Sequence, residues 1–281
     1  MDQFGNERAV VFGLPLVKKW DAYDPLEPSY YLDDDSLCCY YSATDHLVLA
    51  SLQSLSGPER NRFASLICGL NPTDKHGVQH VERMLECSDV WRGVGEVLLR
   101  HDDLTNLTNE ETARANHPAM KPVYKLCEQY GLPVLLHQNS TSVGRHDDYV
   151  YLHELRELLE CHPDLCVVWA HCGLSRRVFH EHYHEMVEML LTAYTQLHVD
   201  VSWIGFDDVV VSEGLVRTEW VDLIERFADR FMIGSDLTGH FDHLGPTMRR
   251  YNGLLEGLSR DARQKVAEGN ADRVFFGGRP D

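Results

Sequence analysis

Three short apolar stretches decide the fold of this chain: Pro133-Val134-Leu135-Leu136-His137, Cys166-Val167-Val168-Trp169-Ala170-His171 and Phe231-Met232-Ile233-Gly234-Ser235-Asp236. Each stretch is rich in β-branched or aromatic residues and is flanked by helix-like sequence, which is typical of a buried parallel strand. Each also ends in a residue that can bind a metal or move a proton. Strand and helix alternate with a period of about 30 residues, the size of one βαβ step. The pattern predicts an α/β protein of the TIM (β/α)₈ barrel class, in which functional groups meet at the carboxyl ends of the strands.

The chain has 281 residues, an ordinary length for one such barrel. We expect a single domain over residues 1–281, with a long loop insertion around residues 14–61 that contains one helical piece. The pattern yields seven strands, whereas a closed barrel takes eight. We therefore expect strand 1 of the barrel to be missing from this chain; the alternative is that an unrelated segment closes the sheet.

The composition argues against a nucleic-acid-binding protein, a membrane-spanning protein and a disulfide-bonded protein. The net charge of −18 argues against a nucleic-acid partner, because such binding needs a basic face. No apolar run reaches the ~18 residues of a membrane span. The 8 cysteines lie mostly in apolar patterns and form no Cys-x-x-Cys pair, as in reduced cytosolic proteins. We expect a cytoplasmic enzyme with a small-molecule substrate and leave homo-oligomerisation open.

His137, His171 and Asp236 are the leading site candidates. Two imidazoles and a carboxylate match the ligands of a mononuclear zinc, manganese or iron site. A divalent ion lowers the pKa of its bound water toward ~7, and a histidine that does not bind metal can polarise a carbonyl or move a proton. Either histidine alone could equally be a core residue. Because both end successive strands, the functional interpretation is favoured for the pair.

The order of these motifs resembles the amidohydrolase superfamily, and within it the amidohydrolase-related branch of decarboxylases and lactonases. The stretches that carry the resemblance are 8–15, 134–137, 169–173, 233–236 and the terminal Gly-Asn-Ala-Asp-Arg-Val-Phe of 269–275. The resemblance implies that His137 is a metal ligand and that His171 polarises the substrate or acts as acid and base. It also implies that Asp236 binds the metal and activates water.

One family motif has no counterpart here. The His-x-His pair that the family places on its first strand does not precede the Val10 strand. The sequence His180-Glu181-His182 falls within a helix predicted over residues 177–194, where positions i and i+2 point apart. We expect a divalent metal, zinc before manganese or iron, but a metal-free site stays open because these two ligands are missing.

Six further residues follow strands or interrupt them and are candidates for binding substrate: Glu96, Arg100, Arg145, Arg176, Trp203 and His240. The arginines could hold a substrate carboxylate bidentately, although loop arginines are usually solvated. Glu96 could be a catalytic acid or the partner of an arginine. Trp203 could wall the pocket or simply pack, and His101 is expected to line the mouth.

The sequence predicts a metal-dependent hydrolase of the amidohydrolase-related family. We expect a small substrate that carries a carboxylate and contains an ester, lactone or amide that activated water attacks. The first alternative is a nonoxidative decarboxylase on the same scaffold. The second is a catalytically silent barrel that serves as a binding module.

Overall fold

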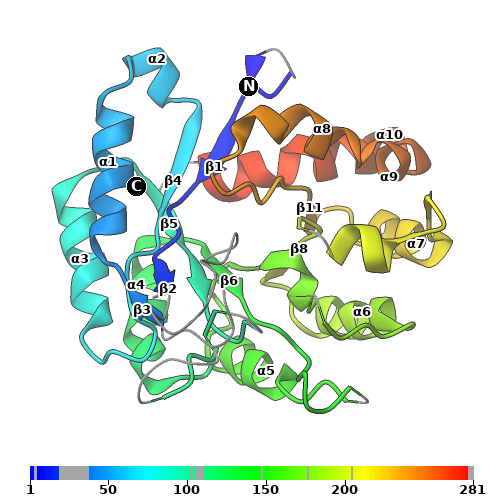
Figure 1. The fold of residues 1–281 in the computed structure, drawn as a ribbon, viewed down its shortest axis with the longest axis horizontal. Helices are drawn as coiled ribbons and strands as arrows, with labels where there is room; N and C mark the ends of the chain where they lie inside the picture. The colour runs from blue at the N-terminus through cyan, green and yellow to red at the C-terminus, as the bar shows by residue number, and fades with distance from the viewer. Residues whose placement is uncertain are drawn as a thin grey trace, which may run out of the picture.

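The computed structural model describes residues 1–2, 5–18, 38–101, 104–105, 111–146, 148–175, 177–203 and 205–277. Within these ranges, one parallel sheet has seven strands, which pair in chain order. They are β1 (Ala9–Val11), β4 (Phe63–Ile67), β5 (Trp91–Leu98), β6 (Val134–His137), β7 (Val167–Trp169), β8 (Leu197–Asp200) and β11 (Phe231–Met232). Figure 1 shows that the sheet curls, with helices on its outer side. The predicted α/β fold of the TIM-barrel class is confirmed.

Helices follow most strands and cover the outside of the curled sheet. They are α3 (Gly77–Cys87), α4 (Lys121–Tyr130), α5 (Leu152–Cys161), α6 (Tyr183–Ala193), α7 (Thr218–Arg226), α8 (Leu244–Arg249), α9 (Asn252–Gly257) and α10 (Arg260–Gln264). Helix α4 ends at Tyr130, because the next residue, Gly131, adopts a left-handed φ of 60° that terminates the helix. The helix predicted from residue 177 begins only at Tyr183. Val178, which the predicted helix includes, is instead buried in the preceding loop.

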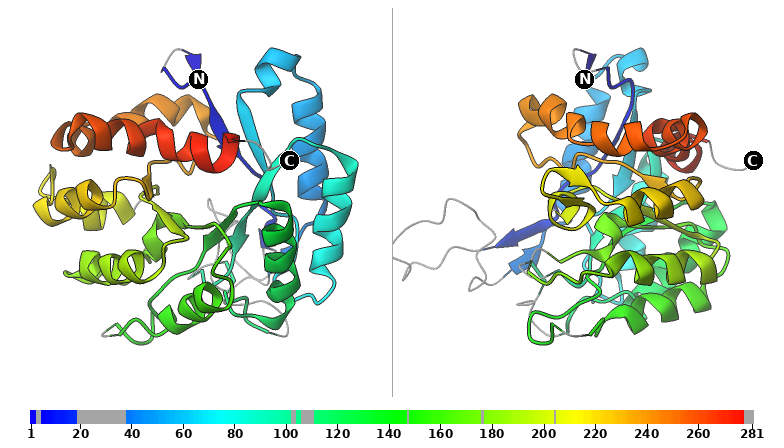
Figure 2. Two further views of the ribbon diagram at one scale, coloured as in Figure 1. Left: turned by 180° about the vertical axis from the view of Figure 1, so that it is seen from behind. Right: turned by 90° about the vertical axis from the view of Figure 1, so that its right-hand side faces the viewer.

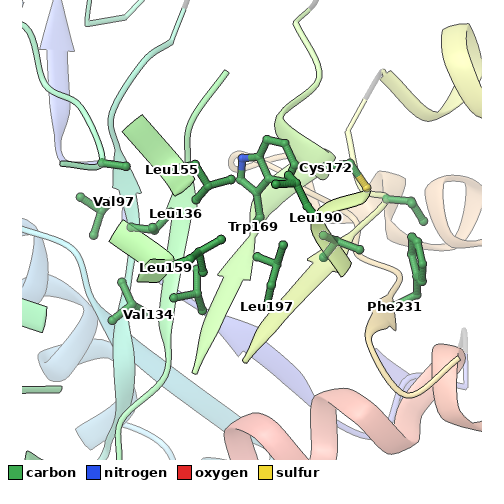
Figure 3. Packing of buried hydrophobic residues seen from close by; sticks show 14 of the residues in the cluster. Val97, Val134, Leu136, Leu155, Leu159, Trp169, Cys172, Leu190, Leu197 and Phe231 are labelled. Carbon is green, nitrogen blue, oxygen red and sulfur yellow. The ribbon is translucent and has the colours of Figure 1, made fainter. Parts of the chain in front are cut away.

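Side chains alternate between two cores, as the pleat of a strand requires. Val134 and Leu136 of β6 face outward and belong to the large core that also contains Leu155 and Leu159 of α5; Figure 3 shows this packing. Leu135 faces inward and belongs to a smaller core inside the curl. His137 lies two residues beyond Leu135, so the same alternation directs it to the inner face of the sheet.

The C-terminal segment packs against both edges of the sheet. A helical turn over Lys265–Gly269 contacts β11, and the next one, over Asp272–Phe276, pairs Asp272 with Arg8 just before β1 at 3.0 Å. Phe275 is buried in the inner core, with Val10 and Phe12 packed against it. Figure 2 shows these red C-terminal helices beside the dark blue β1. The segment therefore fills space between the first and last strands of the described sheet.

The described part of residues 14–61 contains more regular structure than the sequence pattern predicts. β2 (Leu16–Lys18) and β3 (Cys38–Tyr40) form an antiparallel pair, followed by α1 (Ala43–Gln53) and α2 (Gly57–Arg60). Asp45 of α1 is fully buried and accepts hydrogen bonds from the backbone N–H groups of Cys68 and Gly69, both at 2.9 Å. Helix α1 is thus anchored to the loop after β4.

In the described part of the chain, no helix combines the length and apolarity that a membrane crossing requires.

Candidate metal centre

Three buried side chains meet at the carboxyl ends of neighbouring strands. Glu96 lies near the end of β5, His137 is the last residue of β6, and His171 follows β7 in a helical turn over Ala170–Gly173. Glu96 Oε1 lies 3.0 Å from His137 Nδ1 and 3.4 Å from His171 Nε2. One potential ligand atom from each residue lies within 4.8 Å of the others. The side chains of these strands thus converge at one rim, where parallel α/β barrels place their chemistry.

A strained turn presents His171 to this point. His171, Cys172 and Gly173 adopt successive left-handed φ values of 56°, 52° and 66°, which only glycine adopts at little cost. A Cβ atom at Gly173 would lie 1.9 Å from the indole of Trp169. The glycine that follows the strand is therefore required both by the backbone conformation and by the close approach of the buried indole.

The far nitrogen of each imidazole is held by an oxygen. His137 Nε2 lies 3.0 Å from Asn139 Oδ1, and His171 Nδ1 lies 2.7 Å from Ser202 Oγ. A neutral imidazole that donates from its far nitrogen has a lone pair on its near nitrogen. Both lone pairs and the Glu96 carboxylate then point at one another. Such an arrangement needs a cation between its members, either protons or a metal ion, and oxygens behind the ligating histidines are a regular feature of metal sites.

Burial and neighbouring charges shift the pKa values of Glu96, His171 and the nearby Asp236. Burial disfavours the carboxylate of Glu96, but hydrogen bonds with His137 and His171 outweigh burial and lower its pKa. Burial also disfavours the charged form of His171, yet Asp236, Asp200 and Glu96 together raise the pKa of His171 well above its ordinary value. Burial raises the pKa of Asp236 to about 7; attraction from His171 opposes this rise, and repulsion from Glu96 and Asp200 adds to it.

Two aromatic rings adjoin the cluster. The Trp203 ring centre lies 5.2 Å from that of His171 and 5.9 Å from that of His137. The His101 ring lies 4.4 Å from the His137 ring. The structure therefore brings these two candidates of the sequence analysis next to Glu96, His137 and His171. Asp236 interacts electrostatically with Glu96 and His171 but contributes no atom to the group of three ligand atoms.

The structure describes three of the remaining candidates, Arg100, Arg145 and His240. Arg100 donates to both carboxylate oxygens of Glu154, at 2.6 and 3.0 Å. The side chain of Arg145 is 62% exposed and pairs with Asp148. His240 is also exposed, and Arg176 lies outside the described residues. That these residues bind the substrate stays a prediction.

The sequence analysis missed Asp200, Ser202 and Asn139. Asp200 ends β8 and carries the same signal that identifies His137, an acidic or basic residue at the end of an apolar strand. Asn139 and Ser202 carry no such signal, because amides and hydroxyls are common in loops. The prediction that His180-Glu181-His182 lies within a helix is wrong. These residues precede α6, and His182 is exposed beside Glu185.

Comparison with known proteins identifies the family of this chain. A family model described as amidohydrolase matches residues 66–277. The chain belongs to the amidohydrolase family. The resemblance inferred from the motifs is thereby confirmed, and the chain is an enzyme of the amidohydrolase superfamily. Among curated proteins, no sequence matches the chain.

Solved structures share the fold at low sequence identity. An uncharacterized TIM-barrel protein from Bordetella bronchiseptica has a TM-score of 0.63 and 17% identity, covering 98% of this chain and 80% of its own. A putative 2-pyrone-4,6-dicarboxylic acid hydrolase from Pseudomonas putida has a TM-score of 0.50 and 18% identity, covering 89% and 80%. A 2,6-dihydroxybenzoate decarboxylase from Rhizobium has a TM-score of 0.50 and 17% identity, covering 84% and 78%. At these identities the likeness shows the fold alone.

Proposed function

We propose that this protein is a metal-dependent hydrolase that uses activated water on an ester, lactone or amide of a small carboxylated substrate. The observation that supports the proposal most strongly is the convergence of Glu96, His137 and His171 on one buried point. Membership of the amidohydrolase superfamily supports an enzymatic role for that point. Three protein ligands leave a coordination position for water, and metal-bound water is the nucleophile of hydrolysis.

The residues present fit a divalent ion. Two nitrogens and one oxygen are ligands that zinc accepts, and catalytic zinc sites commonly have three protein ligands with water in the fourth position. Manganese and iron accept the same ligand types. When bound, the ion supplies a Lewis acid and lowers the pKa of coordinated water. This set differs from that expected from the sequence, because Glu96 and His171 join His137 while Asp236 stays outside the three.

The side chains around the cluster have separate roles in this proposal. Asp236 accepts a proton from the attacking water. Asn139 and Ser202 orient the two imidazoles through their far nitrogens. Trp203 lies against His171 and His137 and shields the reacting groups from bulk water.

The test is a substrate panel on the metal-reconstituted protein. Zn²⁺- and Mn²⁺-loaded protein is incubated with lactones, esters, amides and aromatic carboxylic acids, and release of acid and of CO₂ is followed. We expect acid release that is lost in His137→Ala and Glu96→Gln and retained in His153→Ala, which changes an exposed histidine of α5. Release of CO₂ without acid would replace hydrolysis by decarboxylation on the same scaffold. Binding without turnover across the whole panel would support the silent module.

A further inference from the structure

One carboxylate oxygen ties the ends of β7 and β8 together. Asp200 Oδ1 accepts from the backbone N–H of His171 at 3.1 Å and from the backbone N–H of Ser202 at 2.9 Å. It also accepts from the hydroxyl of Ser202. Ser202 is 5% exposed and His171 is 3% exposed, so bulk water does not compete strongly for these bonds.

The direction of the hydrogen bonds follows from the donors available. A serine hydroxyl has one proton, and in Ser202 that proton is donated to Asp200. Ser202 Oγ therefore meets His171 Nδ1, 2.7 Å away, with a lone pair. The proton between them belongs to His171 Nδ1. The Nε2 atom of the same ring then faces Glu96 Oε1.

We propose that Asp200 and Ser202 form a relay that fixes the proton of His171 on Nδ1 and so reserves Nε2 for the metal point. Ser202 is a positioning residue in this relay, because it acts through His171 and does not touch the cluster point itself. The use of Nε2 for metal rests on the proposed function. The position of the proton does not, since it follows from the hydroxyl and the carboxylate alone.

The geometry separates the parts of the relay. Asp200 Oδ1 lies 3.6 Å from His171 Nδ1, which is too far for a hydrogen bond, so the carboxylate cannot replace the hydroxyl without movement. Asp200 additionally holds the left-handed backbone of His171 through the backbone N–H. Ser202→Ala therefore removes only the side-chain link, whereas Asp200→Asn keeps an oxygen acceptor for both backbone groups and loses the negative charge.

The decisive readout is the imidazole N–H signal of His171 in nitrogen-resolved proton NMR, assigned by its loss in His171→Gln. We expect a downfield, exchange-protected Nδ1 proton in the unsubstituted protein. The proton loses its protection and shifts upfield in Ser202→Ala, and it is shifted less in Asp200→Asn. Ser65→Ala is the matched control: Ser65 of β4 is also buried, and its hydroxyl donates to Val90 O instead. Thermal unfolding of every variant confirms that it is folded.

An unchanged Nδ1 proton in Ser202→Ala, or a His171 that carries no proton on Nδ1, would overturn the relay. The zinc affinity of the same variants separates this result from failure of the proposed function. If the relay orients a ligand, Ser202→Ala weakens zinc binding by about 10-fold or more, and Ser65→Ala does not. If the unsubstituted protein binds no zinc, the metal proposal fails while the NMR result still decides the relay.

Discussion

Two histidines on neighbouring strands show how differently the two rims of this sheet are built. His171 follows the carboxyl end of β7 and lies among three carboxylates, those of Glu96, Asp200 and Asp236. His198 lies at the amino end of β8, where burial together with Arg273 and Arg230 lowers its pKa to about 4. The same side chain is therefore driven toward the cation at one rim and toward the neutral form at the other.

Burial disfavours the charged form of both histidines, so the opposite directions of their pKa shifts come from the charges of their neighbours. At the amino rim, His198 Nδ1 lies 3.3 Å from Gln196 O, and the Arg273 guanidinium lies 3.5 Å from His198 Nε2. Arg273 also donates to Asp229 O and Asn270 Oδ1. These polar groups of the amino rim are paired within the protein. The carboxyl rim instead collects acceptors that need a proton or metal between them, which is the mark of a functional site.

The largest effect is expected at the turn that presents His171. Gly173→Ala forces a side chain onto the Trp169 indole in a left-handed conformation, and we expect a loss of roughly 3–4 kcal/mol of unfolding free energy. Gly214→Ala is the matched control, because Gly214 is also left-handed but has no atom within 4 Å of the added Cβ. It should cost only about 1 kcal/mol. Chemical denaturation measures both; equal losses would show that the Trp169 contact does not matter.

The amino rim gives the clearest pH effect. The pKa of His198 is about 4 in the folded protein, below the ordinary histidine value of 6.5, so the unfolded chain binds the proton more readily. The contribution of neutral His198 to the unfolding free energy is complete above pH 6.5. It is lost as the pH falls toward 4, which lowers the unfolding free energy by on the order of 3 kcal/mol. His198→Gln should remove that part of the pH dependence of unfolding. The same slope in both proteins would mean that burial, Arg273 and Arg230 do not oppose protonation of His198.

A smaller loss is expected from the terminal motif. Asn270 is buried and donates to Ala228 O and Phe231 O at 2.6 and 2.8 Å. Asn270→Ala leaves these carbonyls without a donor and should cost about 2 kcal/mol. Zinc affinity should be unchanged, because the motif supports the opposite rim. A variant that loses zinc while staying equally stable would link the motif to the site instead.

The smallest effect is expected at Arg145. Its side chain and that of Asp148 are 62% and 55% exposed, so their ion pair is screened. Arg145→Ala should change the unfolding free energy by less than about 0.5 kcal/mol. The KM for an identified substrate tests the predicted role in substrate binding: a raised KM at unchanged stability supports it, and an unchanged KM removes Arg145 from the site.

The sequence predicts the strand ends well because the inward and outward alternation is local. Leu135 and His137 share a face whatever the rest of the chain does, and a glycine after His171 indicates the turn. Side-chain partners from distant segments are a different matter. Arg100 is held by Glu154, 54 residues later in the chain, and no local pattern reports that pairing. Asp236 stands on a loop four residues beyond the short β11, so the pattern does not determine how closely it approaches the cluster.

The relay shows a second limit of sequence reasoning. Asp200 carries a strand-end signal, but Ser202 acquires its role only because its hydroxyl lies between Asp200 and His171. A serine in a loop has no distinctive spacing. The ligand set changes for the same reason, since Glu96 joins His137 through the register between β5 and β6, which is a property of the assembled sheet.

The most direct test is the zinc stoichiometry and affinity of the purified protein, measured by competition with a chromophoric chelator. We predict one tightly bound equivalent in the unsubstituted chain and in the surface variant His153→Ala. Binding should weaken by at least about 100-fold in Glu96→Gln and in His137→Ala. An unsubstituted protein that binds zinc no better than these two variants would contradict the account.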